Sequence, residues 1–488
     1  MGSRLVVAVA LAVLAMPVAA DTCTTTPWQG LAGIPPLTEF PPDYLYLGTY
    51  AGFLYDGSNA IPADHAADGV ALAADVRPRD TAGRLCAPGS AGCKIVFLSI
   101  GFSNNTIEFC GGQGIGGDPD DPAASPCPLP IASPPYIQSE SFIAQALADS
   151  RVDHSSVVLV DGAQGGKTLG DWDPVTTGYG EYNRVRDQIL VPSGLSPLQV
   201  QAVWVKDANA SPTVSLATGD ATHPPDAIVA ERHLGNILRA IRAAYPNAKQ
   251  VFVSPRIYGG YANTAVPPNT LNPEPYAYEL GFSIKWLVRS QVEQSQGAAP
   301  DPNAGDLDYK KNVAPWVAWG PYLWANGTTP RQDGLAWLNT DFRFRYSSGS
   351  GTNECTHPSI NAERKVARQL LDFLVSSPET SWFLATPATC GIAGGSLRFA
   401  ADKETFSWSA VGVAGPFDLA SGDLGVLRSG GSFAGAGCLA DSTSASSAMD
   451  PTVPGPGDAV YYLVRCDAGT WDDGTQAGNR DATLTICP

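Results

Sequence analysis

Ser103 is the residue of this chain whose position best suits covalent chemistry. It follows the apolar run 95–100 and Gly101, a pattern that predicts a buried strand ending in a tight turn. A serine hydroxyl becomes a nucleophile when a neighbouring base removes its proton. The alternative is that Ser103 merely caps a helix, since Ser and Asn are favoured at helix N-termini. The residue by itself leaves both interpretations open.

Histidine is the usual base for such a serine because its unperturbed pKa lies near neutrality. The chain contains five histidines: His65, His154, His223, His233 and His357. His357 differs from the others because it lies in a cysteine-flanked loop just before a long amphipathic pattern. Glu354 stands three residues earlier, a spacing at which one turn can bring a carboxylate to an imidazole and fix its tautomer. The alternative is a surface glutamate beside a capping loop.

Acyl transfer also needs hydrogen-bond donors where negative charge develops on the carbonyl oxygen. Two loops offer such donors. Gly165 and Gly166 lie in DGAQGGKT, and the side-chain amide of Asn209 lies in VKDANASP. Gly and Asn are also ordinary turn residues, so neither loop is decisive when taken alone.

The elements that must position these residues alternate along the chain. Buried strands are predicted at the apolar runs that begin near Lys94, Val157, Val200, Lys249 and Val313. Helices are predicted over 139–150, 180–190, 226–245, 275–294 and 359–376. This alternation predicts an α/β fold with a parallel sheet covered by helices on both faces. Ligands bind at the carboxyl edge of such a sheet, where the loops after the strands converge.

Length and charge limit the kinds of protein that the chain can be. A chain of 488 residues is long enough for two folded units. The net charge of −17 and pI near 4.6 argue against nucleic acid as a partner. Residues 1–20 place Arg4 before an apolar stretch that closes on Ala20, which predicts a cleaved secretory signal peptide. No later segment is long and apolar enough to predict a membrane anchor.

Export makes the cysteines candidates for disulfides. Ten are present: Cys23, Cys86, Cys93, Cys110, Cys127, Cys355, Cys390, Cys438, Cys466 and Cys487. Cys86 with Cys93 and Cys110 with Cys127 are the simplest local pairs, although the connectivity stays open. No two cysteines have the CxxC spacing of a zinc or redox site.

The pattern changes beyond Cys390. The segments SLRFA, TFSWSAV, PFDLASG, GVLRSGG and AVYYLVRC are short and separated by Gly, Ser and Pro. They predict strands of an antiparallel all-β sandwich over 396–488, with a boundary at 388–396. Trp408 and the segments after it resemble fibronectin type III-like modules, for which we expect a binding or spacer role. The segment from Asp21 to Gly92 is loop-rich and is expected to wrap the sheet.

The order of the candidate residues resembles the four blocks of the SGNH (GDSL-like) hydrolases. The resemblance covers about residues 94–375 and implies a flavodoxin-like three-layer α/β/α sandwich over 21–388. It implies that Ser103 is the nucleophile, His357 the base and Glu354 its acid partner. It also implies that Gly166, with Gly165 as the alternative, and Asn209 join the Ser103 amide as oxyanion donors.

Three departures from the family pattern leave the reactive groups in place. Phe102 stands within the family's GDS, Asp207-Ala208-Asn209-Ala210 stands for GxND, and Glu354 replaces Asp in DxxH. Glutamate retains the carboxylate, so the chemistry implied by the resemblance is preserved. The substrate preference stays open.

The expected function is a secreted serine esterase that deacylates a carbohydrate or another small ester through an acyl-enzyme. Such chemistry requires no metal and no organic cofactor. A non-catalytic carbohydrate- or surface-binding protein on the same scaffold, or a lipid esterase, are the alternatives. A gap of about 8 Å or more between Ser103 and His357 would favour the binding protein, since it exceeds hydrogen-bonding reach.

Three other patterns have simpler interpretations. The GxGxxG at 112–117 runs into DPDDP rather than a helix, so we predict a loop and no dinucleotide site. The aspartates of 118–121 lack the regular spacing of a calcium loop. The aromatic residues of 316–324 could stack on sugar rings or belong to the core.

Overall fold

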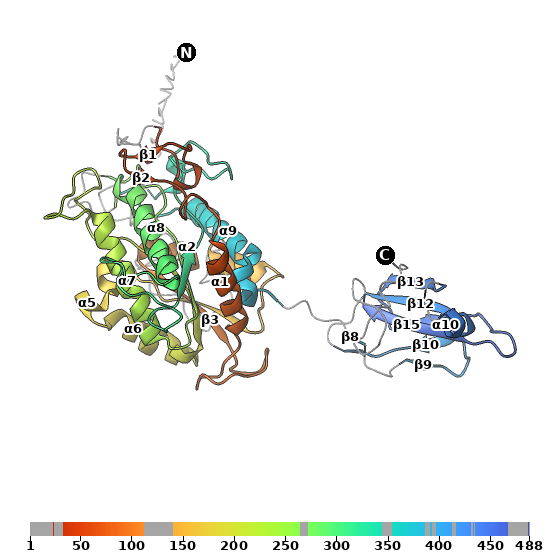
Figure 1. Ribbon diagram of the computed structural model, residues 1–488. Helices are drawn as coiled ribbons and strands as arrows, with labels where there is room; N and C mark the ends of the chain where they lie inside the picture. Colours follow the sequence, from red (N-terminus) through yellow and green to blue (C-terminus); the bar gives the residue numbers. More distant parts are fainter. Residues whose placement is uncertain are drawn as a thin grey trace, which may run out of the picture. The chain divides into compact units, whose positions relative to one another are not determined.

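The computed structural model describes residues 23, 33–111, 140–263, 272–343, 354–385, 391–392, 397–411, 416–430, 433, 435–466 and 487. Contacts within the chain divide it into two compact units, Met1–Ala385 and Thr386–Pro488 (Figure 1). The predicted signal peptide, the GxGxxG and aspartate patterns of 112–121, and Cys127 lie outside the described residues.

A five-stranded parallel sheet forms the centre of the first unit, in the order β4-β3-β5-β6-β7. The strands are β3 Ile95–Gly101, β4 Val157–Asp161, β5 Val200–Lys206, β6 Gln250–Val253 and β7 Trp316–Trp319. Every residue of β3, β5, β6 and β7 is buried, because helices cover both faces of the sheet. The predicted α/β class and the predicted strands are confirmed.

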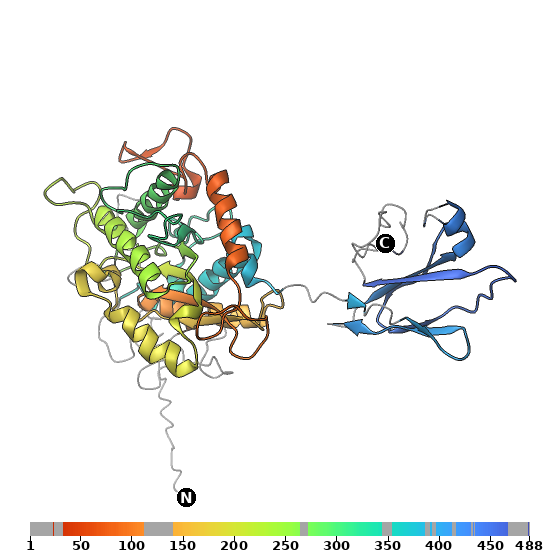
Figure 2. The same cartoon turned by 60° about the horizontal axis from the view of Figure 1, so that its bottom comes forward.

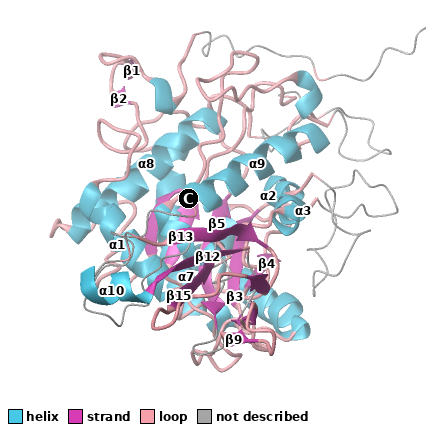
Figure 3. Ribbon diagram, turned by 90° about the vertical axis from the view of Figure 1, so that its right-hand side faces the viewer, coloured by secondary structure: helices cyan, strands magenta, loops and turns pink. Residues whose placement is uncertain are grey.

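Helices make up the two outer layers. Their bounds are α1 Ala63–Asp75, α2 Ser103–Cys110, α3 Phe142–Ala148, α4 Leu169–Trp172, α5 Pro174–Thr177, α6 Gly180–Arg184, α7 Asp226–Ala244, α8 Tyr276–Ser295 and α9 Ile360–Ser376. Figures 1 and 2 show α7 and α8 side by side, with α1 and α9 on the other side of the sheet. Helices α2 and α3 contact each other and α9 (Figure 3). Among the described residues, no helix combines the length and apolarity needed to cross a membrane.

Short elements complete the first unit. They are η2 Leu37–Glu39, β1 Leu45–Tyr46, β2 Tyr50–Ala51, η3 Val185–Leu190, η4 Val191–Ser193, η5 Pro197–Gln199, η6 Asn339–Asp341 and η7 Pro378–Phe383. The segment expected to be loop-rich therefore contains the antiparallel β1–β2 pair and helix α1. Tyr46 fastens this pair to α8, since its hydroxyl donates a hydrogen bond of 2.9 Å to Glu279 Oε1.

The second unit is built on antiparallel strands, as predicted for an all-β domain. Its elements are β8 Gly391–Ile392, β9 Arg398–Phe399, β10 Thr405–Ser407, β11 Ala410–Val411, β12 Phe417–Asp423, α10 Leu424–Gly430, β13 Gly437–Thr443, β14 Ser447–Met449 and β15 Val460–Cys466. One local prediction is wrong. Gly425–Gly430 of GVLRSGG belong to helix α10 rather than to a strand, because Asp423 Oδ1 accepts hydrogen bonds from the amides of Gly425 and Val426 as a helix cap would.

Candidate active site

The turn between β3 and α2 puts Ser103 at the first position of a helix. A Cβ on Gly101 would lie 2.1 Å from the carbonyl oxygen of Lys206, so only glycine allows β3 and β5 to approach this closely. Phe102 is extended and is the N-cap of α2, without a side-chain capping bond. The Ser103 hydroxyl points elsewhere, because its hydrogen bond crosses to His357. Helix capping therefore does not account for Ser103.

Ser103, His357 and Glu354 form one hydrogen-bonded chain. Ser103 Oγ lies 2.7 Å from His357 Nε2, and His357 Nδ1 lies 2.6 Å from Glu354 Oε2. These distances suit a neutral imidazole whose Nδ1–H donates to the carboxylate while Nε2 accepts the serine proton. The three residues keep 7%, 7% and 5% of their exposure, so water competes little for either bond. The arrangement can activate a nucleophile, hold its proton and orient the base.

The base and the acid lie in one loop, residues 354–358, called the histidine loop below. A backbone hydrogen bond and a disulfide hold this loop in place. The amide of Arg343 donates to the carbonyl of His357 at 2.9 Å. A disulfide joins Cys355, between the acid and the base, to Cys23 at a sequence separation of 332. The position of the imidazole is therefore fixed by parts of the chain that are far apart in sequence.

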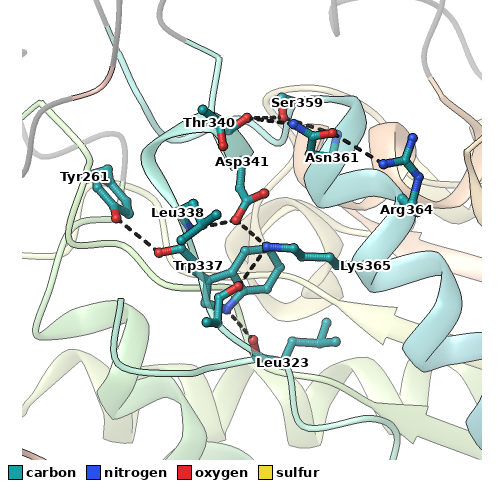
Figure 4. A network of polar contacts seen from close by, with 11 residues as sticks. Tyr261, Leu323, Trp337, Leu338, Thr340, Asp341, Ser359, Asn361, Arg364 and Lys365 are labelled. Carbon is teal, nitrogen blue, oxygen red and sulfur yellow. Dashed lines mark hydrogen bonds and ion pairs between the residues drawn. The ribbon is translucent and has the colours of Figure 1, made fainter. Parts of the chain in front are cut away.

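A polar network fastens residues 337–343, the segment next to the histidine loop, to α9 (Figure 4). Lys365 Nζ donates to Asp341 Oδ2 at 2.6 Å and lies 5.5 Å from the centre of the Trp337 ring. Ser359, the N-cap of α9, donates from Oγ to the carbonyl of Thr340 at 2.8 Å. This segment, which pairs with the histidine loop, is thus anchored to α9 by a partly buried ion pair and by a hydrogen bond from the helix N-cap.

Two polar residues, Asn104 and Asp161, hold α2, the helix that begins with Ser103, in place. Neither was a candidate site residue from the sequence. Asn104 Nδ2 donates to the carbonyl of Thr356 at 3.1 Å, which links α2 directly to the histidine loop. Asp161 ends β4 and accepts hydrogen bonds from Ser99 Oγ at 2.6 Å and from Thr106 Oγ1. Burial raises the pKa of Asp161, and these two bonds act in the opposite direction. Their partners are distant in sequence, so no local pattern indicated them.

A fully buried ion pair joins α2 to the end of β5. Lys206 Nζ lies 2.6 Å from Glu108 Oε2, and neither side chain has any exposed surface. Burial raises the pKa of Glu108 and lowers the pKa of Lys206, while their mutual attraction opposes both shifts. The only sequence signal was a lysine closing the apolar run VQAVWVK. The pair helps to fix the helix that begins with Ser103.

Gly165 and Gly166 lie in the loop after β4, beside the nucleophile turn. The amide of Gln164 donates to the carbonyl of Gly101 at 3.1 Å, which holds this loop against the end of β3. Gly166 has a φ of +76°, and a Cβ there would meet nothing within 4 Å. The backbone at Gly166 is therefore conformationally suited to glycine and open to an approaching ligand.

Asn209 follows β5, the other neighbour of β3. Its Nδ2 donates to the carbonyl of Asp226 at 2.7 Å, and its own carbonyl accepts from Asn272 Nδ2 at 2.9 Å. A cleft lined in part by Tyr276 and Leu280 adjoins it. One amide hydrogen of Asn209 is thus committed to Asp226, and its second hydrogen is the one that an oxyanion would use.

The remaining alternatives are less well supported. Trp316, Trp319, Tyr322 and Trp324 are all buried in the core, so they do not form a sugar-stacking surface. Within the described ranges there is no cluster of three or more His, Cys, Asp or Glu side chains arranged to hold a metal ion. The predicted Cys86–Cys93 disulfide is present.

The fold and the site together define an α/β protein with a buried Ser–His–Glu chain at the carboxyl edge of its sheet. No family model matches the chain, and no curated protein sequence matches it. Among solved structures it is similar to a catalytic mutant of Axe2, an acetylxylan esterase from Geobacillus stearothermophilus. The two are 15% identical, the match covers 58% of this chain and 94% of that chain, and the TM-score is 0.28.

Two other similar structures are a psychrotrophic esterase from Pseudoalteromonas and a phospholipase A1 from Streptomyces albidoflavus. Both are 14% identical over 57% of this chain, they are covered to 96% and 99%, and both have a TM-score of 0.25. At this level of similarity none of the three supports an inference about function. The function has to be inferred from the site itself.

Proposed function

We propose that the protein hydrolyses carboxylic esters through a covalent acyl-enzyme. The observation that supports this proposal is the chain from Ser103 Oγ to His357 Nε2 at 2.7 Å and from His357 Nδ1 to Glu354 Oε2 at 2.6 Å. A binding protein on this scaffold would not need a buried serine within hydrogen-bonding reach of an oriented imidazole. The geometry therefore favours the enzyme over the non-catalytic alternative.

The proposed reaction proceeds in two halves. Ser103 Oγ attacks the ester carbonyl while His357 Nε2 takes the hydroxyl proton, and the resulting imidazolium returns that proton to the departing alcohol as the C–O bond breaks. Water then attacks the acyl-serine, gives its proton to the same nitrogen, and the acid product leaves as Ser103 regains a proton. Glu354 keeps Nδ1 protonated and faces the imidazolium in both halves.

The oxyanion of each tetrahedral intermediate needs donors placed before the reaction begins. We assign this role to the amides of Ser103 and Gly166, with Gly165 as the alternative glycine, and to the side-chain amide of Asn209. Their support is that the three loops follow adjacent strands β4, β3 and β5, which end at one edge of the sheet.

As substrate we propose a small ester, most specifically an acylated carbohydrate outside the cytoplasm. The support is the predicted signal peptide, the disulfides Cys23–Cys355, Cys86–Cys93 and Cys438–Cys487, and the resemblance to SGNH hydrolases. The second unit, which we propose to be a fibronectin type III-like module, would bind a surface or polysaccharide or act as a spacer.

A chromogenic short-chain ester tests the proposal. Ser103→Ala is expected to lower kcat by at least about 10³-fold, because the nucleophile is lost. Ser155→Ala, which alters a surface serine bonded to Asp153, serves as the control and is expected to retain activity. A fluorophosphonate probe should label the wild type on Ser103 and leave Ser103→Ala unlabelled. Inactive wild type, or an active Ser103→Ala, contradicts the proposal.

A further inference from the structure

Arg256 contacts the residues next to Ser103 and His357, and the proposed reaction does not use it. It comes three residues after the end of β6, at the same edge of the sheet as Ser103 and Asn209. Only 1% of its surface is exposed. A buried guanidinium is costly to desolvate, so its contacts indicate what its position achieves.

Two contacts of Arg256 are made with the residues that precede the nucleophile and the base. Its Nη2 donates to Thr356 Oγ1 at 2.7 Å, and Thr356 precedes His357. Its Cζ lies 5.5 Å from the centre of the Phe102 ring, and Phe102 precedes Ser103. The guanidinium of Arg256 thus contacts both the turn that carries Ser103 and the histidine loop, which together must bring Oγ and Nε2 within reach of each other.

Other buried arginines of the first unit are paired with carboxylates. Arg343 contacts Glu363 at 3.3 Å, and Arg331 contacts Asp333. No carboxylate in the described part of the chain lies within ion-pair distance of Arg256, and its Nε has no hydrogen-bond partner there. Ion pairing therefore does not explain why an arginine occupies this position.

Arg256 is nevertheless charged at neutral pH. Burial lowers the pKa of its guanidinium to about 10, and the more distant carboxylates of Glu108, Glu274 and Glu354 oppose that shift. Since this pKa is well above 7, the side chain remains a cation. Its positive charge lies over the ring of Phe102 and interacts at longer range with the carboxylate of Glu354.

We propose that Arg256 is a positioning residue for the reaction, fixing the nucleophile turn through Phe102 and the histidine loop through Thr356. This role rests on the proposed esterase function. Its effect is on the approach of Ser103 Oγ to His357 Nε2 and not on substrate binding. Because a small misplacement of reacting groups lowers the rate of chemistry, its loss should lower kcat and leave KM unchanged.

Three variants of the full chain separate this role from simple destabilisation. Arg256→Met is expected to lower kcat for the chromogenic ester by about 100-fold, and Arg256→Lys, which keeps the charge without the planar fork, by about 10-fold. Thr356→Val, which removes the acceptor, should lower kcat by about 10-fold. KM should stay within about 2-fold in all three.

A double-mutant cycle provides the decisive measurement. If Arg256 acts through Thr356, Arg256→Met combined with Thr356→Val should lose no more kcat than Arg256→Met alone, whereas independent effects would multiply. Arg331→Met is the matched control, since it removes a buried arginine bonded to the carbonyl of Trp324, and it should lower thermal stability with kcat retained.

The outcomes distinguish this inference from the proposed function. Wild-type turnover with unchanged kcat in Arg256→Lys and Thr356→Val overturns the positioning role alone, as does a loss that appears only in KM. If Arg256→Met does not fold, those two variants still decide the question. A wild type that neither hydrolyses the ester nor reacts with the fluorophosphonate at Ser103 overturns both proposals.

Discussion

At the scale of the residue, Glu354 is a buried carboxylate whose desolvation is offset by its hydrogen bond with His357. The residue retains 5% of its exposure, and its Oε2 lies 2.6 Å from His357 Nδ1. Removing a carboxylate from water is unfavourable unless hydrogen bonds or charge replace the lost hydration. The imidazole supplies a hydrogen bond at rest and a positive charge while it holds the serine proton. The acid is thus paired most strongly when the reaction needs it.

This pairing predicts the effect of a neutral isostere. Glu354→Gln should lower kcat by about 10²- to 10⁴-fold, because an amide can present NH2 to Nδ1 and favour the wrong tautomer. Steady-state kinetics on a short-chain ester would measure the loss. Glu140→Gln, which breaks a surface pair with Arg364, is the control and should keep kcat within about 2-fold. Wild-type kcat in Glu354→Gln would remove Glu354 from the mechanism.

The candidate residues differed in how far the sequence could indicate them. Ser103 and His357 stood at ends of strongly patterned elements, and the spacing of Glu354 linked it to His357. Asn104 and Arg256 could not be identified in the same way. Their significance lies in contacts with Thr356, 252 and 100 residues away, which only the folded chain creates.

At the scale of the element, burial decided which parts of the fold the sequence predicted. The central strands are buried along their length, so their apolar runs were conspicuous. Helix α1 was missed because its buried residues are His65, Gly69 and Ala73, a stripe without large apolar side chains. A Cβ on Gly69 would lie 2.4 Å from the Trp316 ring. The backbone of this helix therefore packs closely against Trp316, a contact that the hydrophobic pattern of the sequence does not indicate.

The disulfide between Cys23 and Cys355 ties the histidine loop to a distant part of the chain, so its removal should affect both stability and catalysis. Replacing Cys23 and Cys355 together by Ser should lower the free energy of unfolding by about 2–5 kcal/mol and kcat by about 10-fold, since the loop loses a covalent anchor. Urea unfolding and ester kinetics would measure the two effects.

The chain supplies a matched control for that experiment. Cys86 and Cys93 form a disulfide at a sequence separation of only 7, and replacing both by Ser should leave kcat within about 2-fold. Equal losses of kcat in the two double variants would mean that the Cys23–Cys355 bridge has no specific connection to the site.

At the scale of the whole molecule, the two units have separate cores of very different size. The first is built around the buried sheet, whereas the second packs Phe406, Trp408, Phe417 and Leu419 in its main core. The Cys438–Cys487 disulfide lies within the second unit, as expected for a small domain that needs covalent support. The sequence placed the change of pattern at 388–396, and the contact division falls between Ala385 and Thr386. A change in residue pattern shows that a new domain has begun, but the residue at which contacts separate depends on packing.

The same division predicts where catalysis and any binding function reside. All proposed catalytic and oxyanion residues lie before Ala385. A chain ending at residue 385 should therefore keep kcat/KM for a small soluble ester within about 3-fold of the full-length value, because a site complete within one core does not need the second. If the second unit binds polysaccharide, the full-length protein should sediment with an insoluble acetylated polysaccharide and the shortened chain should not. Circular dichroism and fluorophosphonate labelling of Ser103 would establish that the shortened chain is folded. A folded, labelled chain with kcat/KM reduced by about 100-fold would instead show that the second unit takes part in the hydrolysis of small esters.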